Sequence, residues 1–190
     1  MPPTGRRERK KAQTRQALAD AAERLFLEHG YDGVTVAQIA DEADVSIATL
    51  FKHVPDGKEA LIFDDGAERR EGLVKAVHDR PPGTPILDAV REFFEGRGVF
   101  ATDLTPDLQL KRDLIVATPA LGDYQRKLWM TAEAPLAEAI AAESGRAPSD
   151  PAVRALARYV LEVPDLASRE PDPLSALTAI FTLLQTGWHD

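Results

Sequence analysis

Residues 35–53 read TVAQIADEADVSIATLFKH, and this stretch decides the fold. Thr35 and Ser46 are residue types whose side chains accept hydrogen bonds from the first amides of a helix. Each is followed by apolar residues at helical spacing, which predicts one short helix over 36–43 and another over 47–53. Two short helices with so brief a connection are typical of a helix-turn-helix.

The residues within this stretch suit a steep crossing of two helices. Ala40 is small enough for the helix axes to approach, and Asp44 is one of the few non-glycine types that adopt a positive φ in a turn. The apolar positions expected to pack between the helices are Val36, Ile39, Val45 and Leu50. The spacing favours a DNA-binding module, and an ordinary helical hairpin is the alternative.

Motifs on both sides of the stretch keep the same register, after a basic first helix expected over about 6–29 and ended by a glycine. They are Gly30-Tyr31, Thr35, Ile39-Ala40, Ala43-Asp44-Val45-Ser46, Thr49-Leu50-Phe51 and Lys58-Glu59-Ala60-Leu61. With them, residues 10–63 resemble the N-terminal domain of the TetR family of bacterial transcriptional repressors. The chain departs from the family pattern at the turn glycine, which is Asp44, at the glycine replaced by Ala48, and at the aromatic motif, which reads Leu50-Phe51-Lys52-His53-Val54. These departures leave the operator sequence open.

The resemblance implies two sets of DNA contacts. Residues at positions that usually contact phosphates are Thr35, Phe51, His53 and Lys58. Residues on or at the start of the recognition helix, which faces the major groove, are Ser46, Ile47, Ala48, Thr49 and Lys52. Phosphate contacts set the register on DNA, whereas contacts to base edges specify the sequence. The alternatives are that Phe51 is a core residue and Lys52 a solvated surface charge.

The charge of the chain is distributed unevenly. The formal net charge is −8, but residues 1–16 carry +5, residues 1–60 carry −1 and residues 61–190 carry −7. A basic start is thus followed by an acidic body. The basic start is either a solvated tail or an arm that binds phosphates beside a DNA-reading module.

The rest of the chain has helical patterns separated by Pro and Gly. Helices are expected at 58–79, 86–101, 105–117, 119–144, 150–168 and 172–188, and several begin with Asp or Thr followed by Pro. No stretch shows a clear alternation of apolar and polar residues. The prediction is an all-α protein with a three-helix DNA-binding helix-turn-helix domain and basic arm over 1–57. A larger helical bundle over 58–190 is expected to bind ligand and to dimerise.

The last two expected helices each have an apolar face. Its residues are Val153, Leu156, Val160, Leu177, Ile180, Phe181, Leu184 and Trp188. The family resemblance implies that two such helices from each subunit form the four-helix interface of a homodimer. The alternative is that these residues fill the core of their own subunit.

The family resemblance also implies a small-molecule effector in the middle helices. The candidate contacts are His78, Phe93, Arg97, Phe100, Tyr124 and Trp129. Aromatic residues at helical spacing more often fill a core than line a pocket, so the class of ligand does not follow from the sequence.

Catalysis has little support in the sequence. There is no cysteine, and the four histidines lack metal-ligand spacing, so neither a cofactor nor a metal site is expected. Residues 96–101 fit G-x-G-x-x-A, but that dinucleotide fingerprint requires a preceding strand, and the residues before it have a helical pattern. No apolar run is long enough to span a membrane, and the N-terminus lacks a signal-peptide pattern, so a cytoplasmic protein is expected.

The prediction is therefore a homodimeric, sequence-specific transcriptional regulator, specifically a repressor that a small-molecule effector releases from a palindromic double-stranded DNA operator. The alternative is a ligand-independent helix-turn-helix DNA-binding protein, which would share the N-terminal module and lack the effector switch.

Overall fold

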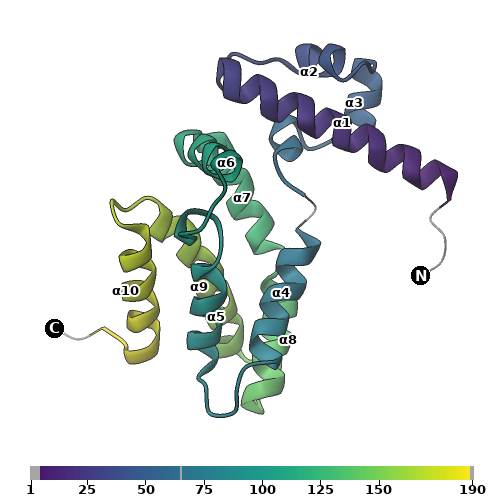
Figure 1. Ribbon diagram of the computed structural model, residues 1–190. Coiled ribbons are helices and arrows are strands. Elements are labelled where there is room, and N and C mark those ends of the chain that lie inside the picture. Colours follow the sequence, from purple (N-terminus) through teal and green to yellow (C-terminus); the bar gives the residue numbers. More distant parts are fainter. Residues whose placement is uncertain (1–4, 65, 189–190) are drawn as a thin grey trace. The chain divides into compact units, whose positions relative to one another are not determined.

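The elements of the chain are helices, arranged in two units that are described separately below. The computed structural model describes residues 5–64 and 66–188, and within those ranges every regular element is an α-helix or a short 3-10 helix (Figure 1). This confirms the all-α prediction. One unit comprises Met1–Asp64 with Pro106–Tyr124, and the other comprises Asp65–Thr105 with Gln125–Asp190.

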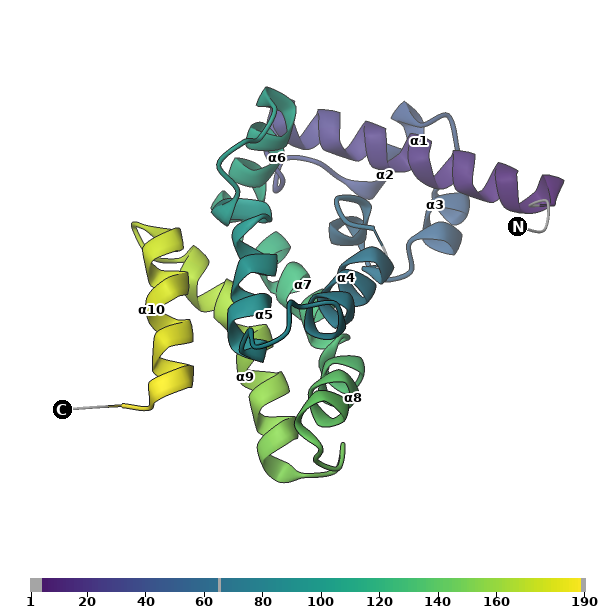
Figure 2. The ribbon, with the colours of Figure 1, turned by 60° about the horizontal axis from the view of Figure 1, so that its bottom comes forward.

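The first unit is built around a long basic helix. Its elements are α1 (Arg6–His29), α2 (Val36–Glu42), α3 (Ile47–His53), the 3-10 helix η1 (Lys58–Leu61), α6 (Pro106–Ala117) and the first residues of α7 (Pro119–Met130). Leu18, Ala22 and Phe26 form a fully buried stripe on α1, because residues four apart lie on one helix face. Helices α2 and α3 pack against α1 and bury Ile39 and Leu50 (Figures 1 and 2).

The caps and the turn of the helix-turn-helix match the sequence-based prediction. The Thr35 hydroxyl accepts a hydrogen bond from the Gln38 amide at 3.3 Å, and the Ser46 hydroxyl accepts one from the Thr49 amide at 3.2 Å. Asp44 has φ of 54° and is the non-glycine residue with positive φ in the described ranges. The turn therefore keeps its backbone without glycine, because Asp tolerates the left-handed region.

The second unit is a ring of neighbouring helices. It contains α4 (Ala67–His78), α5 (Ile86–Glu95), the 3-10 helix η2 (Gly98–Phe100), the rest of α7, α8 (Glu133–Ser144), α9 (Pro151–Ser168) and α10 (Pro173–Thr186). Helix α4 packs on α8, α8 on α9, α9 on α10, α10 on α5, and α5 on α4 (Figure 2). Asp150 and Asp172 cap α9 and α10, each with Pro at the first helical position, as the Asp-Pro pairs predicted.

A network of ion pairs joins three helices of the second unit. Arg126 of α7 donates two hydrogen bonds to the Glu162 carboxylate of α9, at 2.6 and 2.7 Å. Arg158 reaches the same carboxylate at 3.2 Å and the Glu133 carboxylate of α8 at 3.0 Å. These contacts lower the pKa of Glu162, chiefly through the Arg126 hydrogen bond.

Two of the expected helices are interrupted. The segment expected as one helix over 58–79 is η1 followed by α4, because Gly66, with φ of 72°, takes a left-handed conformation before α4 begins. The segment expected as one helix over 119–144 is α7 and α8, which are separated at 131–132. Pro135 explains this break, because a proline ring clashes with the carbonyl four residues earlier in a continuous helix. Helix α5 also ends early, at Glu95, and η2 replaces the last turns expected up to 101.

The division of the chain also differs from the expected boundary between 57 and 58. Residues Lys58–Leu61 and the following residues up to Asp64 group with α1 to α3, and so does Pro106–Tyr124. The N-terminal unit therefore recruits a helix from far along the chain, which a boundary drawn along the sequence does not capture.

Candidate nucleic-acid interface

The outward face of α3 is formed by residues that the sequence analysis assigned to the recognition helix. Leu50 is the buried residue of this helix, whereas Ala48 and Lys52 are exposed and Ile47 and Phe51 are exposed by 45% and 49%. Phe51 is therefore not a core residue. A short helix that leaves two large apolar side chains and a lysine in solvent has a face suited to a partner surface.

Ser46 and Thr49 are tied to each other at the start of α3. Their hydroxyls lie 2.9 Å apart, and the Thr49 amide also donates to Ser46. Ser46 is exposed and Thr49 half-buried. This hydrogen-bonded pair fixes the first turn of the recognition helix, and Ser46 is the more exposed residue of the two.

The basic arm expected at the N-terminus is part of α1 from Arg6 onward. Five exposed cations occupy its first two turns: Arg6, Arg7, Arg9, Lys10 and Lys11. Residues 1–4 lie outside the described residues. A helix holds these cations at fixed spacing, which an extended tail would not do.

Arg15, the next cation of α1, has an internal role that the sequence analysis missed. Its guanidinium donates to the carbonyls of His53 at 3.1 Å, Ala60 at 3.4 Å and Phe63 at 3.4 Å. It therefore joins α1 to the end of α3 and to η1. Its position in a basic run is typical of a solvent-exposed charge, so the sequence gives no local signal of this contact.

His53 lies at the end of α3 among cations. Its Nδ1 atom is buried and has no hydrogen-bond partner among the described residues. Burial lowers the pKa of His53, and repulsion from Lys11, Lys52 and Arg15 lowers it further. The imidazole is therefore neutral near pH 7, and the surrounding charge is positive, which favours an anion nearby.

Thr35 and Lys58 were both expected to contact phosphates, and both have partners inside the domain. The Thr35 hydroxyl is 2.8 Å from Gln38 Oε1 and caps α2. The Lys58 ammonium donates to the carbonyls of Tyr31 and Val34, each at 2.7 Å, and lies 3.9 Å from the centre of the Tyr31 ring. Lys58 thus fastens η1 to the loop after α1, a role that sequence spacing did not indicate.

The candidate ligand contacts fall into separate places. Phe93, Phe100 and Trp129 belong to the buried core of the second unit, and Arg97 stacks on Phe93. His78 is exposed at the end of α4 and pairs with Glu143 at 3.1 Å. Tyr124 belongs to the first unit, where it stacks on Phe63. Five of the six candidates therefore lie in the second unit, four of them in or against its core and His78 on its surface, whereas Tyr124 lies in the first unit.

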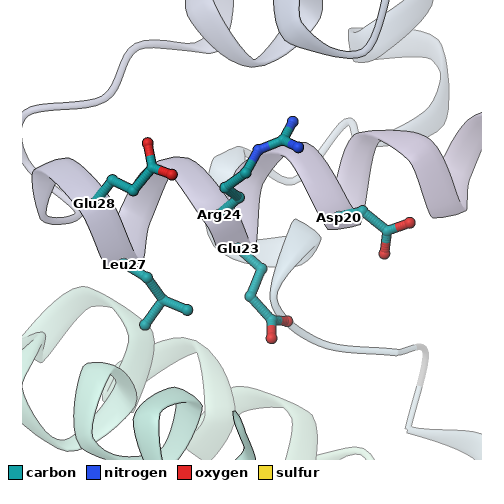
Figure 3. Close-up of a pocket in the computed structure, with 5 residues that line it drawn as sticks. All are labelled: Asp20, Glu23, Arg24, Leu27 and Glu28. Atoms are coloured by element: carbon teal, nitrogen blue, oxygen red, sulfur yellow. The ribbon is translucent and has the colours of Figure 1, made fainter.

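A surface pocket lies on α1 rather than in the helical body (Figure 3). It is lined by Asp20, Glu23, Arg24, Leu27 and Glu28. Two of these side chains are already neutralised, because Glu23 pairs with Lys111 at 2.7 Å and Arg24 pairs with Glu42. None of the effector candidates lines it.

The candidate interface residues divide between the core and the surface. Those that are at most 2% exposed, in the core of their own unit, are Val153, Val160, Leu177 and Phe181. For these four the core alternative is correct, because a buried side chain cannot contact another subunit. Leu156, Ile180 and Leu184 are half-buried at the edge of the core, and Trp188 is 80% exposed.

Other apolar residues of α9 and α10 are exposed that were not among the predicted interface contacts. They are Tyr159, Leu166, Leu174 and Leu183. Helix α10 has no charged residue between Pro173 and Thr186. A signal was available, because a helix that is apolar or neutral on every face must be covered on more than one side.

Comparison with known proteins places these features in a family. Residues 18–64 match the model of bacterial regulatory proteins of the tetR family, and residues 84–188 match the MftR C-terminal domain. The chain is 36% identical over 90 residues to the HTH-type transcriptional regulator TcmR of Streptomyces glaucescens, which covers 47% of this chain and 39% of TcmR. It is 26% identical over 153 residues to the putative mycofactocin biosynthesis transcriptional regulator MftR of Mycobacterium tuberculosis, which covers 79% of this chain and 75% of that protein.

A solved structure has the same fold over nearly the whole chain. Thermus thermophilus FadR, described as a TetR-family transcriptional repressor in complex with lauroyl-CoA, superposes with a TM-score of 0.53 at 24% identity. The superposition covers 93% of this chain and 95% of FadR. The match to TcmR spans well under half of that protein, whereas the matches to the two family models together reach from Leu18 to Trp188. With a helix-turn-helix at its start and a family-specific domain over more than half of its length, the chain belongs to the TetR family of bacterial regulatory proteins.

Proposed function

We propose that this chain is a homodimeric transcriptional repressor, released from a palindromic DNA operator by a small-molecule effector bound in its helical body. The observation that carries the proposal is the outward face of α3, where Ile47, Phe51 and Lys52 are exposed on a helix whose start is fixed by a cap. A rigid helix with an exposed apolar and cationic face fits the major groove, where base edges and thymine methyl groups are read.

The cations near this face supply the contacts to phosphate. The first two turns of α1 present exposed basic residues, and Lys52 is an exposed cation in the last turn of α3. Every cation that neutralises a phosphate releases counterions, so the affinity for DNA falls with salt, with a slope of about 0.9 per contact. The acidic body, which has a net charge of −7 over 61–190, disfavours unspecific binding elsewhere on the protein.

The exposed face of α10 is the proposed dimer interface. Thr178, Thr182 and Thr186 each donate a hydrogen bond to the carbonyl four residues earlier. Their hydroxyls are therefore satisfied within the helix, and their methyl groups remain with Leu174 and Leu183 on an uncharged surface. Such a surface can be buried against its symmetry mate without leaving unpaired charges.

The proposed effector lies in the second unit, among the aromatic residues near Arg97. FadR, which shares the fold, is described with lauroyl-CoA bound, which supports a ligand-responsive body as the working hypothesis for this chain. The proposal is a regulator rather than an enzyme. The relatives are named as regulators, and residues 96–101 follow helix α5 where a dinucleotide fingerprint requires a strand.

Selection of duplexes bound by the full chain from a random pool tests the DNA-binding part. The expected result is an enriched palindrome that the protein binds more tightly than a scrambled duplex of equal length. Lys75→Ala is the matched control for substitutions on α3, because Lys75 is an exposed lysine of α4. A pool without any enriched sequence would refute sequence-specific binding.

A second experiment tests the effector part. Small metabolites are screened for thermal stabilisation of the protein, and those that stabilise it are added to the DNA complex. Stabilising compounds that lower the affinity for the operator support the repressor with an effector. Stabilisation by no compound would favour the ligand-independent helix-turn-helix protein instead.

A further inference from the structure

The guanidinium of Arg97 is held in a fixed position just after α5. Its carbon Cζ lies 3.7 Å from the centre of the Phe93 ring, and its Nη1 donates to the Phe93 carbonyl at 3.0 Å. Among the described residues, this carbonyl is the acceptor to which the Arg97 guanidinium donates. A guanidinium has five N–H donors. Most of the donors of this half-buried group are thus not used by the described part of the chain.

Two other partly buried arginines of the same unit each face a carboxylate. Arg80 pairs with Glu143 at 2.8 Å, and Arg91 pairs with Glu95. Arg97 has no carboxylate within 4.0 Å among the described residues, and Glu68 acts on it only at longer range. Burial lowers the pKa of Arg97, since a desolvated cation without a carboxylate in direct contact is unfavourable.

The surroundings of Arg97 combine aromatic rings with further positive charge. Phe93 meets Trp129 edge to face, with ring centres 6.4 Å apart. Arg69 of α4 lies over the Trp129 ring, with its Cζ 5.9 Å from the ring centre. Two guanidinium groups therefore lie on two rings that touch each other.

Gly72 of α4 allows this packing. A Cβ atom at position 72 would lie 2.9 Å from the Phe93 ring and 3.5 Å from Arg97 Nη2. Ring and guanidinium therefore pack directly on the backbone of α4. The cation is oriented by the ring, by a carbonyl and by a neighbouring helix before any ligand arrives, and such preorganisation lowers the cost of binding.

We propose that Arg97 binds an oxyanion, the carboxylate or phosphate group of the effector, and that the apolar part of the effector lies along Phe93 and Trp129. The inference rests on the proposed effector function and adds the chemical class of the ligand. A planar guanidinium binds either oxyanion through two parallel hydrogen bonds. An anion here also restores the counter-charge that Arg97 lacks.

Three probes that share a phenyl ring, and a fourth without one, test the class of ligand. Benzoate and phenyl phosphate are anions from the two possible sources, benzamide is the neutral counterpart of benzoate, and inorganic phosphate is the anion without a ring. Binding to the full chain is measured by calorimetry at millimolar concentrations and by thermal shift. We expect at least one of the two ringed anions to bind and benzamide not to bind, and the preferred anion identifies the source.

Matched variants locate the binding site. Arg97→Gln removes the charge and should reduce the affinity for the bound anion by about tenfold, the loss typical of one charge-assisted hydrogen bond. Arg97→Lys keeps the charge but loses the planar pair of donors, so its affinity for the anion should lie between that of Arg97→Gln and that of the unsubstituted chain. Arg91→Gln removes the same charge from the neighbouring helix α5, where the cation is already paired, and should keep the affinity of the unsubstituted chain within about twofold.

Two results would overturn the inference. One is that none of the anions binds the unsubstituted chain. The other is that Arg97→Gln and Arg91→Gln weaken binding equally, which would mean a general effect of charge. Operator affinity is measured in parallel, so that a failure of anion binding at Arg97 can be told apart from a failure of DNA binding. An anion that binds through Arg97 but leaves operator affinity unchanged would keep the site and refute its role as effector site.

Discussion

The ammonium of Lys58 lies 2.7 Å from the carbonyl oxygen of Tyr31 and 3.9 Å above the ring of the same residue. One lysine thus satisfies a carbonyl of the loop after α1 and stacks on its aromatic side chain. The Tyr31 hydroxyl in turn bonds to Glu59, the residue beside Lys58. Burial and the Glu59 carboxylate both raise the pKa of Tyr31, so the phenol stays protonated and keeps donating this bond.

We expect Lys58→Ala to destabilise the N-terminal unit. Two charge-assisted hydrogen bonds and a cation–π contact are lost, and two carbonyls lose their donor, so the free energy of unfolding should fall by about 2–4 kcal/mol. Urea unfolding of the full chain, followed by circular dichroism, measures the change. Lys52→Ala, which removes an exposed lysine, should stay within about 0.5 kcal/mol of the unsubstituted chain. If Lys58→Ala kept full stability but lost affinity for every duplex, Lys58 would be a phosphate contact and not an internal brace.

We expect Lys52→Ala and Arg9→Ala to affect DNA binding differently. Lys52 lies on the outward face of α3, so its removal should reduce affinity for the selected operator by about 1–3 kcal/mol and affect a scrambled duplex less. Arg9 is exposed on the first turns of α1, so its removal should weaken both complexes alike and lower the salt slope by about 1. Gel-shift titrations at several salt concentrations measure both. Equal losses on the two duplexes for Lys52→Ala would show that this lysine contacts phosphate only.

We expect Leu183→Asp to give a folded monomer and Phe181→Asp to give an unfolded chain. Leu183 is on the exposed, uncharged face of α10, where a carboxylate would be buried against the partner, whereas Phe181 is fully buried in its own subunit. Light scattering and circular dichroism separate the two outcomes. Leu110→Asp, at a leucine of α6 that is more exposed than Leu183, is the control and should stay dimeric. A dimer that persists in Leu183→Asp would move the interface away from this face.

We expect Glu162→Gln to lower the stability of the second unit at neutral pH. Between neutral and acid pH, the stability of this variant should change less than that of the unsubstituted chain. Arg126 lowers the pKa of Glu162 in the folded state. The stabilisation is therefore present above the unfolded pKa of about 4.3 and is lost as the pH falls through the lower, folded value. At pH 7 the loss should be about 1–3 kcal/mol, because the substitution leaves Arg126 without its bidentate partner.

Urea unfolding of both proteins between neutral and acid pH tests this expectation. Glu138→Gln, at an exposed glutamate of α8, is the control and should follow the unsubstituted chain at every pH. Parallel pH curves for Glu162→Gln and the unsubstituted chain would mean that the ion pair does not contribute.

The helix-turn-helix could be predicted from the sequence because its signals are local. A capping hydroxyl acts on an amide three residues away, as Ser46 does on Thr49, and the turn depends on the backbone preference of Asp44. The interruptions at Gly66 and Pro135 are also local signals, but the apolar periodicity that continues past both residues outweighed them in the expectation of two long helices.

The candidate site was less predictable because its contacts join residues far apart in the chain. Arg15 and Lys58 stand in the sequence as ordinary cations, and only the folded chain brings carbonyls to them from 24 to 48 residues away. The same holds for Arg97, whose lack of a carboxylate becomes visible only among its neighbours.

By itself, the sequence determined the all-α class, the helix-turn-helix and the contrast between a basic start and an acidic body. Each of these follows from spacing, capping or charge along the chain. The tertiary structure decided which apolar residues are core and which remain exposed. On α10, Phe181 is buried whereas Leu183 is in solvent, although the two are chemically alike in a periodic pattern. Periodicity shows that a face is apolar, but the helices packed on that face decide what covers it.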